Sequence, residues 1–215
     1  MQYETEEQQV EAIKNWWKEN GTAVIFGAVV GLGGLWGWRY YNDAKIEAQE
    51  VASAAYTQTM DELAVKGLDA ATETQAFIDA NKDNNYAALA AMMLAKSAVE
   101  AGEFKQAEQQ LQWIKQNKAS DILLATVNLR LARVQSQLTE YDAAIATLAE
   151  IKSEAFQAKA SEVKGDIYML QGNAEQARSA YQAAVAAGGA VNNPALQIKL
   201  DDLAAPASAD EALNG

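Results

Sequence analysis

The chain has 215 residues, of which 17 are basic and 29 are acidic, so its formal net charge is −12. A chain this acidic, without a basic cluster, predicts that nucleic acid is not a partner, because its surface would repel phosphate. Cysteine and histidine are both absent, which excludes disulfides, thiolate or imidazole metal sites and the Ser-His-Asp triad. We therefore expect a protein that is not an enzyme, with no cofactor, no metal and no small-molecule substrate.

The first predicted element is a short acidic helix over residues 1–19, which carry two lysines and five glutamates. Val10, Ile13 and Trp17 share one face at helical spacing. A cleaved signal peptide is disfavoured, because its basic N-terminal region is missing. This helix is expected to extend into the segment that follows.

An uncharged segment follows over residues 20–38, between Glu19 and Arg39. Nineteen helical residues are about 28 Å long, close to the roughly 30 Å hydrocarbon thickness of a bilayer. Tryptophan and tyrosine, which favour membrane interfaces, flank both ends of the segment: Trp16, Trp17, Trp36, Trp38, Tyr40 and Tyr41. We predict one transmembrane helix over 20–41, with the lipid bilayer as a partner. A buried core helix is the alternative.

Charge does not orient this helix. Lys14 and Lys18 precede the segment, and Arg39 and Lys45 follow it, so the positive-inside rule gives a tie.

Glycines form two G-x-x-x-G pairs in the same segment. The pairs are Gly27 with Gly31 and Gly33 with Gly37. Glycine lets another helix backbone approach closely in lipid. We predict that these four residues contact another membrane helix, and general glycine enrichment in membrane helices is the alternative.

The rest of the chain is predicted to be all-α. Proline occurs at positions 194 and 206 alone, and helix-forming residue types dominate. A repeat of small residues recurs at steps of 37 and 33 residues, at Ala107, Ala144 and Ala177. Twelve residues before each of these stands another small residue: Ala95, Ala132 and Gly165. The pattern resembles the tetratricopeptide repeat, a helix pair with a period of about 34 residues.

These observations predict the domain organisation. The fold class is all-α, with a single N-terminal transmembrane helix followed by a tetratricopeptide-like helical-repeat solenoid. We predict the repeat domain over 42–203, its clearest repeats over 86–117, 121–152 and 158–188, a capping helix over 194–203 and a disordered tail over 204–215. An unrelated alanine-rich helical bundle is the alternative.

The first helices of stacked repeats usually line a concave surface that binds other proteins. Their alignment predicts a candidate partner-binding surface made of Leu89, Met92, Lys96, Val99, Thr126, Leu129, Arg133 and Ser136. Some of these side chains could instead pack against the helices of residues 39–81.

Three sequence blocks resemble one family. They are residues 9–21 together with 37–41, the phrase at 128–135, and the phrase at 172–180. Over roughly residues 1–203 the chain is similar to the YfgM-like family of ancillary SecYEG translocon subunits from Gram-negative bacteria. The resemblance implies a single-pass inner-membrane protein with residues 1–19 in the cytoplasm and the repeat domain in the periplasm.

The resemblance also implies partners. These would be the SecYEG translocon and a membrane-anchored periplasmic chaperone of the prolyl-isomerase type, with the repeat domain helping to hand exported proteins to periplasmic chaperones. Three other functions stay open. They are an envelope scaffold unrelated to secretion, an enzyme with an unrecognised carboxylate site, and a homo-oligomer held by the glycine pairs.

Overall fold

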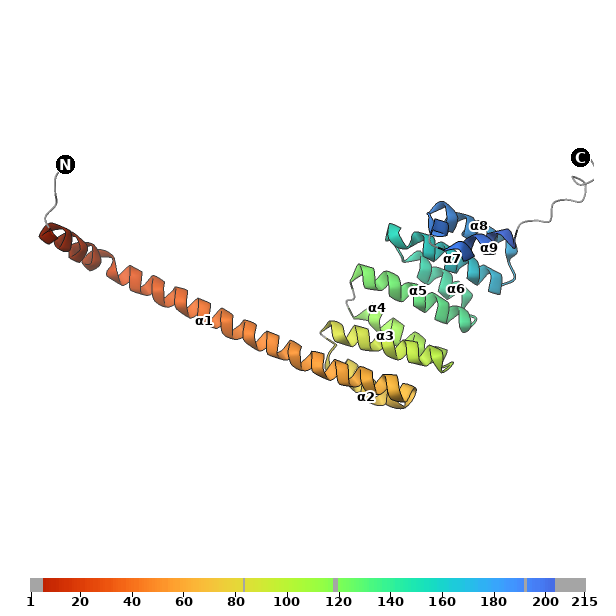
Figure 1. The fold of residues 1–215 in the computed structure, drawn as a ribbon, viewed down its shortest axis with the longest axis horizontal. Helices are drawn as coiled ribbons and strands as arrows, with labels where there is room; N and C mark the ends of the chain where they lie inside the picture. The colour runs from red at the N-terminus through yellow and green to blue at the C-terminus, as the bar shows by residue number, and fades with distance from the viewer. Residues whose placement is uncertain (1–5, 83, 118–119, 192, 204–215) are drawn as a thin grey trace, which may run out of the picture. The chain divides into compact units, whose positions relative to one another are not determined.

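The computed structural model describes residues 6–82, 84–117, 120–191 and 193–203, and within these ranges it contains helices and no strand (Figure 1). The predicted all-α fold is thereby confirmed. The elements are α1 (Glu6–Lys66), the 3₁₀ helix η1 (Gly67–Ala70), α2 (Ala71–Ala80), α3 (Asn85–Glu100), α4 (Phe104–Gln116), α5 (Asp121–Gln137), α6 (Tyr141–Ala149), α7 (Glu154–Leu170), α8 (Ala174–Ala186), the 3₁₀ helix η2 (Gly189–Val191) and α9 (Pro194–Asp201). The predicted tail over 204–215 lies outside the described residues.

The chain divides into two units, one up to Ser53 and one from Ala54. The first unit consists of the N-terminal part of α1. It contains the one segment among the described residues that is long and apolar enough to cross a membrane, judged by length and composition. Its large apolar side chains are exposed, with Phe26 at 72% and Trp36 at 73% of their full accessibility. Such side chains need an apolar surrounding, which a bilayer supplies.

The second unit is a row of antiparallel helix pairs, α3 with α4, α5 with α6, and α7 with α8, which stack in chain order in Figure 1. The small residues of the sequence pattern lie where the two helices of each pair meet. Ala107, Ala144 and Ala177 have no exposed surface. Because a methyl group occupies little space, the paired helices pack closely, and large side chains fill the layers between pairs.

A divergent pair precedes these three. The C-terminal part of α1 packs with α2 against α3, and Leu63, Phe77 and Ile78 are buried there. Tyr56 lies with its ring centroid 6.1 Å from that of Phe77 and 5.3 Å from that of Tyr86. At the other end, α9 covers the last pair with Leu196, which is buried with Tyr181 and Ala184. Both ends of the apolar core are therefore covered by helices.

The turn inside each repeat has the same backbone geometry. Gly102 and Gly172 have φ of +80° and +75°, and Thr139 stands at the matching place with φ of +61°. In each turn the following amide donates to a carbonyl five residues earlier, as from Glu103 N to Ala98 O at 2.8 Å and from Glu140 N to Gln135 O at 2.9 Å. Thr139 is thus a β-branched residue in a left-handed conformation that favours glycine.

Thr139→Gly should stabilise the repeat domain. Removing the Cβ relieves the steric cost of the left-handed conformation, and the flexibility that glycine adds to the unfolded chain offsets only part of that gain. We expect the free energy of unfolding to rise by about 0.5–1 kcal/mol. Urea unfolding of the full chain in detergent, followed by circular dichroism, measures it. Thr139→Ala is the control, because it keeps the Cβ and should bring no such gain. A loss of stability in Thr139→Gly would contradict this account of the turn.

Candidate interaction surface

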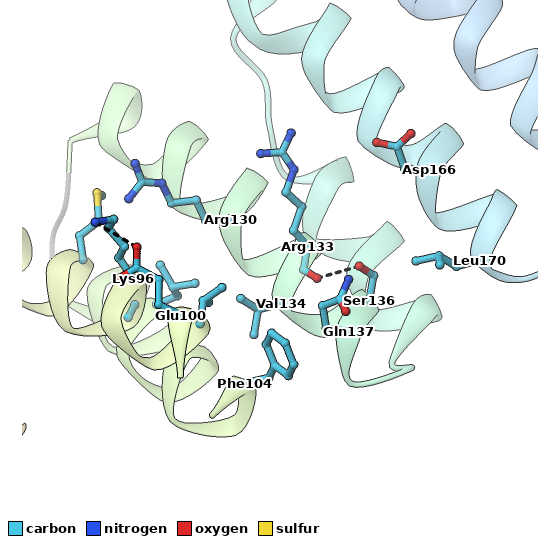
Figure 2. Close-up of a pocket in the computed structure, with 14 residues that line it drawn as sticks. Lys96, Glu100, Phe104, Arg130, Arg133, Val134, Ser136, Gln137, Asp166 and Leu170 are labelled. Atoms are coloured by element: carbon cyan, nitrogen blue, oxygen red, sulfur yellow. Dashed lines mark hydrogen bonds and ion pairs between the residues drawn. The ribbon is translucent and has the colours of Figure 1, made fainter. Parts of the chain in front are cut away.

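A groove of about 600 Å³ opens between the first helices of the three repeats, α3, α5 and α7, with α4 beneath them (Figure 2). Its lining residues are Met92, Ala95, Lys96, Val99, Glu100, Phe104, Leu111, Arg130, Arg133, Val134, Ser136, Gln137, Asp166 and Leu170. The volume lies within the usual range of small-ligand sites.

The floor of the groove is apolar. Ala95, Leu111 and Val134 are buried and belong to the core that joins the first repeats. Val99 and Leu170 keep 40% and 53% of their surface exposed. An apolar side chain placed in the groove would therefore contact apolar groups from four helices and remove exposed apolar surface from water.

The acidic side chains of the groove form ion pairs with other described residues, whereas its two arginines do not. Lys96 Nζ lies 3.2 Å from Glu100 Oε1, and Asp166 Oδ1 lies 2.7 Å from Lys199 Nζ. Arg130 and Arg133 lie one turn apart on α5, and both side chains are exposed. Within the part of the chain that the structure describes, neither guanidinium makes an ion pair, and Figure 2 shows both extending away from α5. Among the described residues, these two positive charges of the groove therefore have no ion-pair partner.

The structure places the residues of the predicted surface in three settings. Met92, Lys96, Val99, Arg133 and Ser136 line the groove. Leu89 is exposed on α3 and Thr126 is half-buried on α5, both outside the groove lining. Leu129 is only 8% exposed and packs in the core of the second repeat with Ala125 and Ala132, so its side chain serves packing. A binding role for the others stays a prediction.

Sequence reasoning missed Phe104, Arg130, Asp166 and Leu170 as groove residues. Arg130 could have been found, because it precedes Arg133 by three positions and so shares its helix face. Asp166 and Leu170 come from the third repeat, and nothing in a local pattern shows that α7 reaches the groove of the first two.

The four glycines of the predicted membrane contact all lie on α1 with open space around them. A Cβ placed at Gly27, Gly31, Gly33 or Gly37 would meet no other heavy atom within 4 Å. With about 100° of rotation per residue, the Gly27/Gly31 pair and the Gly33/Gly37 pair face directions roughly 120° apart. They therefore form two separate small-residue faces.

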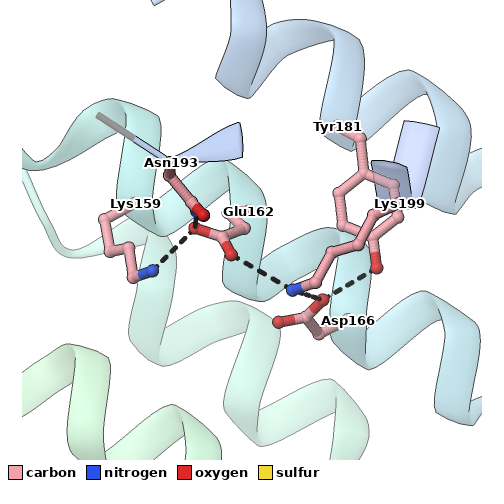
Figure 3. A network of polar contacts seen from close by, with 6 residues as sticks. All are labelled: Lys159, Glu162, Asp166, Tyr181, Asn193 and Lys199. Atoms are coloured by element: carbon pink, nitrogen blue, oxygen red, sulfur yellow. Dashed lines mark hydrogen bonds and ion pairs between the residues drawn. The ribbon is translucent and has the colours of Figure 1, made fainter. Parts of the chain in front are cut away.

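A polar network beside the groove fastens the capping helix α9 to α7 (Figure 3). Lys199 Nζ lies between two carboxylates, 3.1 Å from Glu162 Oε1 and 2.7 Å from Asp166 Oδ1. The Tyr181 hydroxyl donates to Asp166 at 2.8 Å, and Lys159 Nζ donates to Glu162 at 2.7 Å. This network also balances the charge of Asp166, which faces the groove.

Burial and pairing act in opposite directions on these groups. Burial alone would raise the pKa of Glu162, but the hydrogen bonds from Lys159 and Lys199 outweigh it and hold that pKa below its usual value of 4.5. Burial would lower the pKa of Lys199, and the hydrogen bonds to Asp166 and Glu162 raise it instead. Burial and the bond to Asp166 raise the pKa of Tyr181. At neutral pH Glu162 is therefore ionised, Lys199 is protonated and Tyr181 is neutral.

Known proteins match nearly the whole chain. A family model described as a tetratricopeptide repeat-like domain matches residues 14–205. A protein of Escherichia coli (strain K12) is 39% identical over 183 residues, which cover 85% of this chain and 88% of the relative. Relatives in Aggregatibacter actinomycetemcomitans and Haemophilus influenzae are 35% and 32% identical, each over 92% of this chain and 97% of the relative. All three are named ancillary SecYEG translocon subunit.

The chain belongs to the YfgM-like family of ancillary SecYEG translocon subunits. The match includes both the apolar segment of α1 and the repeats. Among the described residues there is no group of three or more His, Cys, Asp or Glu side chains that could hold a metal ion. A repeat scaffold of this family points to binding of other proteins and away from catalysis.

Lys199→Met should loosen the capping helix. It leaves Glu162, whose side chain is 8% exposed, with fewer donors, while Lys199 itself is 35% exposed, which limits the effect. We expect a loss of about 1–2 kcal/mol in the stability of α9. Hydrogen exchange of the α9 amides in the full chain measures it, with the exposed Lys152→Met as control.

The effect should depend on pH. Because the folded pKa of Glu162 is lowered, its contribution is complete above the usual value of 4.5 and is lost as pH falls through the lowered value. The difference between wild type and Lys199→Met should therefore shrink from about pH 7 to about pH 3. A difference that stays constant would show that the Glu162–Lys199 pair does not hold α9.

Proposed function

We propose that the protein is an ancillary subunit of the Sec translocon, anchored in the bacterial inner membrane by α1. The observation that carries this proposal is the extent of the family match. The three relatives are 32–39% identical to this chain over 85–92% of its length, and the match includes both the apolar segment of α1 and the repeats. The relatives' shared name supports association with SecYEG. A protein similar along both parts is expected to use both parts in the same way.

The mechanism is tethering. A repeat domain joined to a membrane helix stays near whatever that helix contacts, so its effective concentration beside the channel is high even when each single contact is weak. The repeat domain lies in the periplasm and engages a membrane-anchored chaperone of the prolyl-isomerase type. In this way it helps to hand exported proteins to periplasmic chaperones.

Two features support a binding role for the repeat domain. The groove is open to solvent and lined by side chains from four helices. The exposed glycines of α1 leave room for another helix backbone in the membrane. The first feature suits contact with a chaperone, and the second suits contact with the channel or with the chaperone's own anchor.

Purification of the tagged full chain from membranes in mild detergent tests the association. We expect SecY, SecE and SecG to be recovered with it. Recovery of cell-division or wall-synthesis proteins without Sec subunits would contradict the proposal and favour an envelope scaffold unrelated to secretion.

Leucine substitutions test the glycine faces in the same purification. Gly27→Leu with Gly31→Leu should reduce recovery of Sec subunits about tenfold if that face packs against the channel, because two isobutyl groups prevent close approach. Gly33→Leu with Gly37→Leu tests the second face separately. Ala28→Leu, which lies on neither face, is the control. Undiminished recovery with both glycine pairs substituted would exclude the glycines as the contact.

A further inference from the structure

We propose that the groove between α3, α5 and α7 binds a segment of a partner protein in which a bulky apolar side chain stands beside aspartate or glutamate residues. This proposal rests on the proposed function only in placing the repeat domain near other proteins. It names the chemistry that those proteins must present.

The charge of the groove is complementary to that of an acidic segment. The chain carries a net charge of −12 and has four arginines, and two of these four, Arg130 and Arg133, lie at this groove. The two acids of the groove are already matched, Glu100 by Lys96 and Asp166 by Lys199 and Tyr181. The groove is thus a positive site on an acidic protein, and an acidic segment is steered toward it.

Both groove cations that lack an ion-pair partner among the described residues are arginines. A guanidinium donates two parallel hydrogen bonds to one carboxylate, which an ammonium cannot do. Arg130 and Arg133 lie on one face of α5 at a spacing of three residues, so their guanidinium groups can receive two neighbouring carboxylates. Both side chains are exposed and neither makes an ion pair within the described ranges, so no existing salt bridge has to break before a carboxylate binds.

The same groove also has an apolar floor. Val99 and Leu170 are exposed to 40% and 53%, and Phe104 and Val134 also line the groove. A volume of about 600 Å³ holds one or two bulky side chains, with the rest of the segment lying over the edge. The floor supplies apolar contact and the arginines supply orientation, the combination by which protein surfaces recognise short segments.

A binding titration on the full chain in detergent tests the proposal. The probe is a fluorescein-labelled synthetic peptide with a phenylalanine between two glutamates, flanked by glycine and serine. Two matched peptides replace the glutamates by glutamine or the phenylalanine by serine. We expect saturable binding of the first peptide, and affinity at least about tenfold lower for each of the others.

Variants of the protein locate the binding site. Arg130→Gln with Arg133→Gln should weaken binding of the acidic peptide about tenfold and reduce its salt dependence. The control, Lys82→Gln with Lys152→Gln, removes the same charge at exposed positions outside the groove lining and should change affinity less than about twofold. Val99→Asn should weaken binding, whereas Ile122→Asn, at a side chain 74% exposed outside the groove lining, should not.

Three results would overturn the proposal. One is equal binding of the glutamate and glutamine peptides. The second is unchanged affinity in the double arginine variant. The third is a gain of more than about tenfold on deletion of residues 204–215, which would make this chain's own acidic segment the occupant.

The test separates this proposal from the proposed function. Peptide binding is measured on the purified chain without SecYEG, and recovery of Sec subunits is measured without the peptide. Failure of peptide binding would overturn only the groove proposal, and failure to recover Sec subunits would overturn only the proposed function.

Discussion

The repeat domain depends on small side chains where its helices cross. Ala107, Ala144 and Ala177 have no exposed surface, and a Cβ at Gly165 would overlap the Tyr181 ring. The first two repeats have Ala with Leu at the places where the third has Gly165 with Tyr181, so a larger ring is matched by a smaller partner. Because the two helices pack against each other in the same way in every pair, the pairs stack in chain order. This stacking brings α3, α5 and α7 together at one groove.

The two units of the chain differ in how their apolar side chains are exposed to solvent. In the repeat domain the apolar core side chains are buried between helices, and the two acidic side chains of the groove are paired within the domain. In the N-terminal part of α1 the apolar side chains are exposed along the whole uncharged segment. A bilayer would remove that exposure, and a repeat domain joined to such a helix would stay close to the membrane.

Periodicity and composition were sufficient to predict the fold, because they express constraints that act along one helix or between two neighbouring ones. The spacing of small residues predicted the repeats, and the uncharged segment predicted the apolar helix. The groove was predicted only in part. Aligning the first helices of the repeats was enough to find five of the lining residues, which are Met92, Lys96, Val99, Arg133 and Ser136. Leu170, in contrast, reaches the groove only because three repeats stack. Leu129 was assigned to the surface but is buried, because a first helix contacts both of its neighbours.

The side of the membrane on which the repeat domain lies is the most direct test of the whole account. The chain lacks cysteine, so a single cysteine can be introduced at Glu103, in an exposed turn, or at Glu11, before the apolar segment. Intact spheroplasts are then treated with a membrane-impermeant maleimide. Our account predicts labelling of Glu103→Cys in intact spheroplasts and of Glu11→Cys only after lysis. Labelling of Glu11→Cys in intact spheroplasts, with Glu103→Cys protected until lysis, would place the groove in the cytoplasm and contradict a role in handing over exported proteins.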